Sequence, residues 1–294
     1  MHFGGNTYCT REHDSLKISN GKWCWFSRGI GGKTALDYLI KVKELPFTEA
    51  VERIVGRAAE RPSVFHARAQ PEKPKTLLLP PKSNSNTRVI AYLKSRGIDG
   101  GLIEQCIRSG QLYESLPYHN AVFVGMDRNG TPRYACLRGI GTDFKGEATG
   151  SDKRFSFALP ATGESRMLCV FESAIDLLSY ATMAQAGGLS WRSQHLLSLA
   201  GVYKPQKETQ EHRLPLALTQ YLKDHAEIKT ICLCLDNDMT GRSATEAIRQ
   251  QLAERYKVAS ALPRQGKDYN DWLCIRMGLQ PAKENPMTER SFAR

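Results

Sequence analysis

The sequence predicts an α/β protein whose main part is a parallel sheet covered by helices on both faces, preceded by two smaller parts. Three observations lead to this prediction. Over residues 164–278, continuously apolar runs alternate with helical patterns, which is typical of strands buried in a parallel sheet. Over residues 87–163, two helical patterns precede an alternating pattern around a turn, as in a β-hairpin. A proline-rich stretch at residues 59–86 separates these parts from residues 1–58.

The composition favours a protein with a polyanionic partner. The chain has 294 residues, with 41 lysines and arginines against 30 acidic residues, a net charge of +11. Such an excess favours nucleic acid as a partner, although a solvated basic surface is the simpler alternative. No apolar run approaches the ~20 residues of a membrane span, so no membrane partner is expected. The first residues contain no apolar signal core, which indicates a cytoplasmic protein.

The eight cysteines do not indicate a disulfide framework, because no secretion signal accompanies them. Cys169, Cys232 and Cys234 lie in apolar runs and are interpreted as small core residues.

Residues 1–58 are expected to form a small domain. The run "KWCWFSRGIGGKTALDYLIKV" begins as a short aromatic strand, turns at its glycines and continues as a helix. A second short helix follows, and residues 59–86 are interpreted as a linker because of their proline, serine and asparagine content.

Each later element follows from its own pattern. In residues 87–163 we expect two short helices, the hairpin over "AVFVGMDRNGTPRYACLRGI", and one more strand over "GSDKRFSFALP". In residues 164–278, strands at "RMLCVFES", "HLLSLAG", "TICLCLD" and "KVASALP" alternate with helices. Residues 279–294 lack periodicity and are expected to be a loose tail.

Acidic residues follow the ends of several predicted strands. Glu172 ends the first strand, Asp236 ends the third, and Asp238 follows it in the loop. Asp176 lies one helical turn beyond Glu172, and Asp268 follows the last strand. Because the carboxyl ends of parallel strands share one edge, these carboxylates are expected to converge and to raise one another's pKa. A divalent cation such as Mg²⁺, which prefers oxygen ligands, would relieve the repulsion.

Gly241, near the following helix start, would let backbone N–H groups approach a phosphate.

Taken singly, each acid has a structural alternative. Asp238 suits a turn, Asp236 a helix start, and Asp268 an N-cap. Asp176 would favour the positive end of its helix. Acids at the ends of separate strands of one alternating unit are nevertheless more simply explained by a shared site.

The run "VFESAIDLLSY", followed by "CLDNDMTGR" and "GKDYNDWL", resembles the Toprim domain of topoisomerases and primases. The resemblance implies that Glu172 is the acid–base or metal glutamate and that Asp236 and Asp238 are a metal pair. Asp176 and Asp268 match secondary acidic positions. It also implies Mg²⁺, or Mn²⁺, as the cofactor. Many primases have glycine directly after the glutamate, whereas this chain has Ser173.

The hairpin and the basic turn after it are similar to the N-terminal half of a DnaG-type primase core. The resemblance implies that four basic side chains contact nucleotide phosphates or template: Arg138, Lys145, Lys153 and Arg154. Arg242, after the Asp-x-Asp pair, is assigned to the same group. The alternative for these residues is ordinary exposed charge.

The first domain resembles a primase zinc-binding domain that has lost its ligands. Cys9, His13 and Cys24 are present, but Ser27 stands where a fourth cysteine would be. Structural zinc normally takes four thiolate or imidazole ligands, so we expect a degenerate, zinc-ribbon-like domain without zinc. In the related proteins another helix usually precedes this domain, so the chain is expected to start late.

Three aromatic residues of the first domain have two interpretations. Trp23, Trp25 and Phe26 would stack on bases in a nucleic-acid complex. Alternatively they form the small core of the domain, which is the interpretation we favour for at least two of them.

The whole arrangement resembles the primase-like Toprim proteins carried by plasmids and other mobile elements of bacteria. It implies a metal-dependent nucleotidyltransferase acting on single-stranded DNA with nucleoside triphosphates, and partners among the replication or mobilisation proteins of such an element. Two alternatives remain: a Toprim nuclease that uses the same metal to activate water, and a catalytically silent DNA-binding accessory protein. No large strand-passage domain fits in this length, which argues against a topoisomerase.

Overall fold

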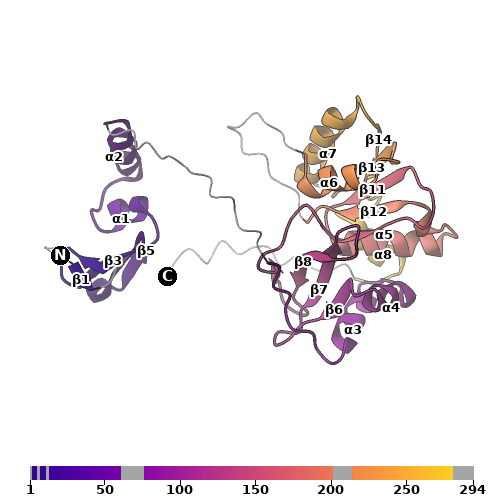
Figure 1. Cartoon of the computed structure of the whole chain (residues 1–294), viewed down its shortest axis with the longest axis horizontal. Coiled ribbons are helices and arrows are strands. Elements are labelled where there is room, and N and C mark those ends of the chain that lie inside the picture. The colour runs from indigo at the N-terminus through magenta and orange to yellow at the C-terminus, as the bar shows by residue number, and fades with distance from the viewer. Residues whose placement is uncertain (1, 5–6, 11–12, 61–75, 201–213, 281–294) are drawn as a thin grey trace. The chain divides into compact units, whose positions relative to one another are not determined.

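The computed structural model describes residues 2–4, 7–10, 13–60, 76–200 and 214–280. The chain divides into two units, Met1–Glu72 and Lys73–Arg294, and each is described by itself (Figure 1). Most of the proline-rich stretch and most of the predicted tail lie outside the described residues. None of the helices in the described ranges is long and apolar enough to cross a membrane.

The first unit is an antiparallel sheet followed by two helices. Its strands pair in chain order: β1 (His2–Gly4), β2 (Thr7–Cys9), β3 (Leu16–Ser19), β4 (Lys22–Trp25) and β5 (Ile30–Gly32). A 3₁₀ turn, η1 (Phe26–Arg28), joins β4 to β5, and helices α1 (Ala35–Lys41) and α2 (Phe47–Glu60) follow. The predicted aromatic strand and both helices are therefore present, and β1 to β3 and β5 are additional. The turn expected at the glycines is made at Gly29, whereas Gly31 and Gly32 pair with β4 as part of β5.

The core of the first unit is built from aromatic side chains. Leu16, Trp23 and Trp25 are buried together, whereas Phe26 is 68% exposed. Gly32 permits this packing, because a Cβ there would lie 2.7 Å from Nε1 of Trp23. Two of the three aromatic residues are thus core residues, and Phe26 alone of the three presents its ring to solvent.

The second unit begins with residues that pack along its first sheet. The amide of Leu78 donates to the carbonyl of Thr149 (2.9 Å), and the hydroxyl of Tyr113 donates to the carbonyl of Pro80 (2.9 Å). Leu77 and Leu79 pack against the buried face of the sheet. This part of the stretch interpreted as a linker is therefore attached to the second unit.

The first sheet of the second unit is antiparallel and follows two helices, α3 (Thr87–Ser95) and α4 (Gly100–Arg108). Its order is β6 (Leu112–Glu114), β7 (Ala121–Met126), β8 (Pro132–Arg138) and β9 (Lys145–Glu147). β7 and β8 are the predicted hairpin. The strand predicted at residues 150–160 is reduced to β10 (Ala158–Leu159), which joins the second sheet instead.

The second sheet has the order β10-β12-β11-β13-β14, in which β10 is antiparallel and the other four strands are parallel. Its parallel strands are β11 (Met167–Phe171), β12 (His195–Ser198), β13 (Thr230–Leu233) and β14 (Lys257–Ser260). Its helices are α5 (Ala174–Ala186), η2 (Trp191–Ser193), α6 (Leu216–Asp224), α7 (Met239–Leu252) and α8 (Tyr269–Arg276). Each parallel strand was predicted from its apolar run.

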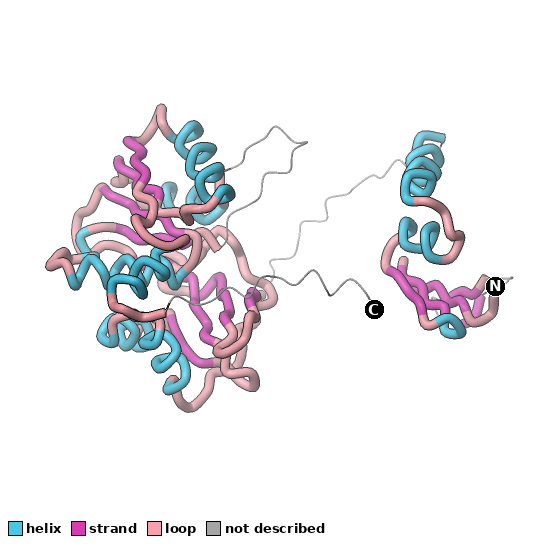
Figure 2. The backbone as a smooth tube through the Cα atoms, turned by 180° about the vertical axis from the view of Figure 1, so that it is seen from behind, coloured by secondary structure: helices cyan, strands magenta, loops and turns pink. Residues whose placement is uncertain are grey.

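Helices cover both faces of the parallel sheet, as Figure 2 shows from behind. One face, with Leu168, Val170 and Ile231, packs against α6 and α7. The other face, with Cys169 and Phe171, packs against α5 and α8. The cluster on this second face also includes Leu93 of α3 and Phe123 of β7. The two parts predicted as residues 87–163 and 164–278 therefore share one hydrophobic core, while their exact boundary stays a prediction. The predicted fold class is confirmed.

Candidate active site

Two acidic residues from neighbouring strands meet at the carboxyl edge of the parallel sheet. β11 and β13 are adjacent, with Val170 opposite Leu233, so the residues that follow them lie side by side. The amide of Asp236 donates a hydrogen bond to Oε1 of Glu172 (3.3 Å). Both side chains are partly buried, and only 15% of the Asp236 side chain is exposed. The strand order thus brings together two residues that are 64 positions apart.

The carboxylates at this edge repel one another. Burial, followed by the charges of Asp176 and Glu172, raises the pKa of Asp236 to about 8. Burial and the charge of Asp176 raise the pKa of Asp268 to about 7. Burial also raises the pKa of Glu172. The ionised forms of these carboxylates are therefore destabilised by burial and by one another. A bound cation would stabilise the ionised forms.

Lys267 supplies part of the compensating charge. Its Nζ lies 3.9 Å from Oδ2 of Asp236 and 3.7 Å from Oδ2 of Asp238. This lysine belongs to the run "GKDYNDWL", and no role was predicted for it from the sequence. The available signal was its place directly before Asp268, in the loop that returns to the acidic edge.

Two of the acids also cap helices. Oδ1 of Asp238 accepts from the amide of Gly241 (2.8 Å) at the start of α7. Oδ1 of Asp268 accepts from the amide of Asp271 (2.7 Å) at the start of α8. The N-cap alternative considered for Asp268 is therefore a real role. The helix-start role considered for Asp236 belongs instead to Asp238, for which a turn was considered. Each cap uses one carboxylate oxygen, so the other oxygen is left for a ligand.

Gly241 has a different role from the expected one. Its amide is taken by the cap of Asp238, so it does not present a phosphate donor. A Cβ at this position would lie 2.2 Å from the carbonyl oxygen of Asp236. Glycine is therefore required here so that α7 can begin against the chain segment that carries the acids.

Asp176 lies behind the acidic edge in a closed polar network. It is 5% exposed and accepts from the hydroxyl of Ser173 (2.6 Å) and from the amide of Asn270 (3.3 Å). Burial raises its pKa, while these hydrogen bonds and the charge of Arg96 lower it. Ser173 also caps α5, which gives a local reason for serine where many primases have glycine.

Two members of this network, Asn270 and Arg96, were not predicted from the sequence. The side-chain amide of Asn270 donates to the carbonyl of Arg96 (3.0 Å) and to the hydroxyl of Ser179 (2.9 Å). The charge of Arg96 lowers the pKa of Asp268 as well as that of Asp176. No sequence motif indicated Arg96. This residue directly follows α3, and it lies near the acids only because α3 shares a hydrophobic core with the parallel sheet.

The acidic edge fits a hard cation held partly through water. All of its donors are carboxylate oxygens, which Mg²⁺ prefers, and their mutual repulsion is relieved by positive charge. Among the described residues, however, no three carboxylates have oxygens that all lie within 4.8 Å of one another. Mg²⁺ commonly uses one or two carboxylates and completes its coordination with water and phosphate, so this spacing is suitable.

The predicted phosphate-binding residues are distributed around the hairpin. Arg138 and Lys145 lie opposite each other on β8 and β9. The charge of Arg138 lowers the pKa of Asp176, so Arg138 lies within electrostatic range of the acids. Lys145 is exposed. The two basic residues are therefore neighbours on the sheet, and Arg138 is the one whose charge is felt by Asp176.

The other predicted basic residues have partners within the chain. Lys153 pairs with Glu147 (3.0 Å), and Arg154 pairs with Asp152 (2.6 Å). Arg242 donates from Nε to Oδ1 of Asn237 (2.9 Å). All three are exposed, and such surface pairs are worth only about 0–1 kcal/mol, so phosphates could replace the partners.

Arg154 also borders a hollow of about 390 Å³ that it shares with Arg128, Tyr221 and His225. None of the candidate acids lines this hollow.

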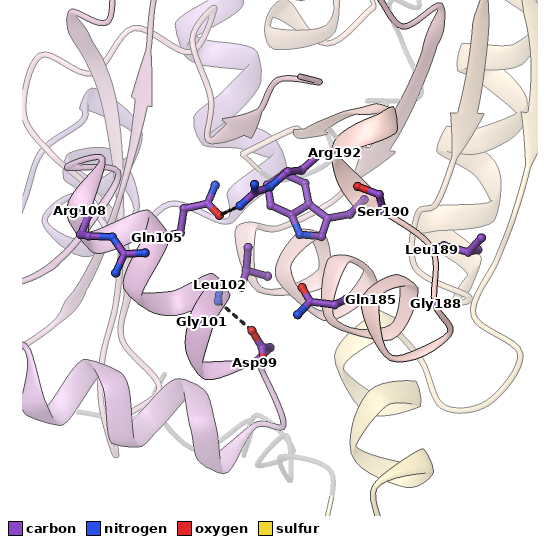
Figure 3. A pocket seen from close by; sticks show the side chains of 11 residues that line it. Asp99, Gly101, Leu102, Gln105, Arg108, Gln185, Gly188, Leu189, Ser190 and Arg192 are labelled. Atoms are coloured by element: carbon purple, nitrogen blue, oxygen red, sulfur yellow. Dashed lines mark hydrogen bonds between the residues drawn. The ribbon is translucent and has the colours of Figure 1, made fainter. Parts of the chain in front are cut away.

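A larger hollow, of about 530 Å³, lies away from the acids, between α4 and the carboxyl end of α5. Figure 3 shows Arg192 reaching Gln105 across it and Asp99 bonded to the amide of Leu102. Ser173 and the acids are at the opposite end of α5, so this hollow does not belong to the candidate active site.

In the first unit, Cys9 of β2 and Cys24 of β4 lie on either side of the same residue of the strand between them, β3. Both are paired with Lys17 of β3, so a basic side chain stands between them on one face of the sheet. The ring of His13 packs on Trp25, with 4.4 Å between ring centroids. Among the described residues, the groups of three ligands with metal-binding spacing do not include Cys9, His13 or Cys24. The absence of zinc from this unit stays a prediction.

Comparison with known families identifies the domain that contains the parallel sheet. A family described as Toprim-like matches residues 169–273, and a family described as a protein of unknown function (DUF3991) matches residues 91–163. Residues 169–273 form a Toprim-like domain. The recognition of a Toprim domain from Glu172 and the Asp236/Asp238 pair is thereby confirmed, since all three residues lie within the matched range.

Two curated proteins are similar to the chain that carries this Toprim domain. An uncharacterized protein of Bacillus anthracis is 26% identical over 257 residues, covering 82% of this chain and 70% of its own length. The 65 kDa protein of Zymomonas mobilis is 24% identical over 287 residues, covering 90% of this chain and 46% of its own length. The chain thus spans less than half of the second relative.

Solved structures similar to this chain include primases. The primase fragment of the bacteriophage T7 primase-helicase protein is 18% identical, with 90% of both chains covered and a TM-score of 0.44. The Aquifex aeolicus primase, with zinc-binding and RNA polymerase domains, is 17% identical, with 94% of this chain and 77% of that chain covered and a TM-score of 0.41. The DnaG catalytic core is 14% identical, with 66% and 70% covered and a TM-score of 0.45.

Proposed function

We propose that this chain is a primase-like, metal-dependent nucleotidyltransferase that acts on single-stranded DNA. The observation that carries the proposal is the meeting of Glu172 and Asp236 at the carboxyl edge of the Toprim sheet, where burial, followed by the neighbouring carboxylates, raises the pKa of Asp236 to about 8. A cluster of this kind destabilises the folded protein unless a cation is bound, which supports a functional rather than a structural purpose.

In this proposal Glu172, Asp236 and Asp238 hold Mg²⁺, or Mn²⁺, and Asp176 and Asp268 support them from behind. When bound, the ion would reduce the charge on the transferring phosphoryl group and favour in-line attack by a 3′-hydroxyl. Asp238 and Asp268 keep their positions because each also caps a helix. Lys267 neutralises part of the negative charge at Asp236 and Asp238 and lies where a triphosphate would approach.

The basic residues then bind phosphates of the nucleoside triphosphate or of the template. Arg138 is assigned to the triphosphate because it lies within electrostatic range of the acids. Lys145, Lys153, Arg154 and Arg242 are assigned to the template backbone because they are exposed. The net charge of +11 supports a polyanionic partner.

We further propose that the protein works in the cytoplasm, in replication or transfer of a mobile element, together with replication or mobilisation proteins of that element. The resemblance stated from the Toprim motifs and the hairpin supports this setting.

The test is extension of single-stranded templates with labelled nucleotides, with and without Mg²⁺, by the wild-type chain and by Asp236→Asn. We expect Mg²⁺-dependent products in the wild type alone. Asp224→Asn, on α6 and outside the site, serves as the matched control. Shortened template without incorporation would indicate a Toprim nuclease, and binding without either product would indicate a silent accessory protein; either result would overturn the proposal.

A further inference from the structure

Three potential metal ligands meet at the edge of the Toprim sheet opposite the acids. His195 is the first residue of β12 and lies opposite Leu168, near the start of β11, whereas Glu172 follows the end of β11. His225 is the C-cap of α6, and Glu227 follows in the connection to β13. None of the three has a role in the proposed nucleotidyl transfer.

The spacing of the three side chains suits a single ion. Each offers one ligand atom, and these atoms all lie within 4.8 Å of one another. Oε1 of Glu227 is 2.9 Å from Nδ1 of His225 and 3.9 Å from Nε2 of His195. In a tetrahedral zinc site with bonds of ~2.0–2.1 Å, neighbouring ligand atoms are roughly 3.3 Å apart, so both distances are within a small adjustment.

The buried imidazole of His195 points to a missing ligand. His195 is 4% exposed, and its Nε2 has no hydrogen-bond partner among the described residues. Buried polar atoms almost always have a partner, so this nitrogen requires an explanation. Its other nitrogen, Nδ1, lies 3.0 Å from the hydroxyl of Tyr221 and 3.5 Å from the amide nitrogen of Ala161. In the tautomer in which Nδ1–H donates to the hydroxyl oxygen of Tyr221, Nε2 carries the lone pair that a metal ion would take.

We propose that His195, His225 and Glu227 bind one divalent transition-metal ion, with Zn²⁺ as the best match. Two imidazoles and one carboxylate are typical zinc ligands, whereas Mg²⁺ prefers oxygen donors alone. Glu227 is 48% exposed, so the fourth position is open to water. The ion would tie the end of α6 to the start of β12, and this site is separate from the first unit, where no zinc is expected.

Other groups of the chain could also take up zinc and must be distinguished. The thiols of Cys169, Cys232 and Cys234 lie within 4.8 Å of one another in the core. Cys24 belongs to the degenerate first unit. Thiolate ligands give Co²⁺ a strong charge-transfer band that imidazole and carboxylate ligands do not give, so substitution by Co²⁺ identifies the donor type.

The experiment uses the full chain, stripped of metal with a chelator and titrated with Zn²⁺ in excess Mg²⁺, which occupies the acidic edge. We expect one bound Zn²⁺ per chain at this site. At a free concentration of 100 times Kd, linkage should raise the Tm of the second unit by roughly 5 °C or more. His225→Ala, at a partly buried position, and Glu227→Gln, at an exposed position, should each weaken Zn²⁺ binding by at least ~10-fold. The Co²⁺ form should lack the thiolate band.

Two variants are the controls. Asp224→Asn removes a neighbouring charge without touching a ligand, and Cys24→Ser removes a thiol of the first unit; both should bind Zn²⁺ as the wild type does. The proposal is overturned if His225→Ala and Glu227→Gln bind Zn²⁺ as tightly as the wild type. It is equally overturned if the wild type takes up no Zn²⁺, or if Co²⁺ is bound only by thiolates.

Discussion

The amide of Asp236 donates a hydrogen bond to the carboxylate of Glu172, with 3.3 Å between N and Oε1. This contact joins the loops after β11 and β13, the two inner strands among the four parallel strands of the Toprim sheet. It fixes the glutamate carboxylate against the segment that carries Asp236 and Asp238. The acids are therefore held together by the backbone of the protein, and a cation would find them already in place.

Asp236→Asn should abolish catalysis without unfolding the protein. The amide keeps the shape of the side chain and removes one charge from a crowded group, so the Tm should be unchanged or slightly higher. Nucleotide incorporation should fall at least ~10²-fold, as when a main electrostatic stabiliser of a transition state is removed. Affinity for single-stranded DNA should change little.

Thermal melting, DNA affinity and incorporation should be measured on the same preparation, with Asp224→Asn as the control. A variant that melts many degrees lower but retains near-normal incorporation per folded molecule would make Asp236 a structural residue.

The stability of the metal-free protein should depend on the charge of Asp236. Its pKa is about 8 in the folded protein and about 3.9 when unfolded, so between these pH values the folded state holds a proton that the unfolded state has lost. Stability is therefore lost as pH rises from about 4 to about 8. Glu172, Asp176 and Asp268 face the group and strengthen the effect, whereas Lys267 weakens it.

In the presence of a chelator, the Tm of Asp236→Asn minus that of the wild type should increase as pH is raised from about 5 to about 8. A difference that is constant over this range would mean that Asp236 is not held in the crowded environment described above.

Lys267→Met should strengthen the effect of Mg²⁺ on stability. Removing a cation that lies 3.7–3.9 Å from two carboxylates leaves more negative charge at the acidic edge. The rise in Tm on adding Mg²⁺ should therefore be larger than in the wild type. Lys257→Met, at an exposed lysine of β14, is the matched control and should respond as the wild type does. An equal or smaller rise in Lys267→Met would show that the lysine does not compete with the ion.

Binding to single-stranded DNA should be sensitive to salt. The logarithm of affinity should fall linearly with the logarithm of salt concentration, with a slope of about −0.7 for each phosphate contacted. Lys145→Ala and Lys153→Ala, at exposed residues assigned to the template backbone, should each reduce the steepness of this salt dependence by about 0.7. Arg249→Ala, which breaks an exposed pair with Glu246 on α7, should leave the slope unchanged. Fluorescence anisotropy over a salt series makes the measurement, and an affinity that does not vary with salt would exclude this mode of binding.

Much of the Toprim domain follows from local patterns in the sequence. Apolar runs with helical patterns between them predicted β11, β12, β13 and β14, because a strand buried on both faces needs apolar side chains throughout. The position of Glu172 and Asp236 at strand ends then predicted that they share an edge, because parallel strands end on the same side. The fold class and the acidic edge were therefore available from the sequence.

Only the tertiary structure decided which residues complete the site. Lys267, Asn270 and Arg96 come from the loop before α8, from α8 itself and from the end of α3, and none has a pattern that indicates the acids. The packing of residues 76–80 on the first sheet and the core shared by α3, β7 and the Toprim sheet were decided in the same way. The proximity of His195, His225 and Glu227 was also decided by the tertiary structure. The physical reason is that periodicity records which face of one element is buried, whereas contacts between elements depend on the order and packing of the strands, which no single segment contains.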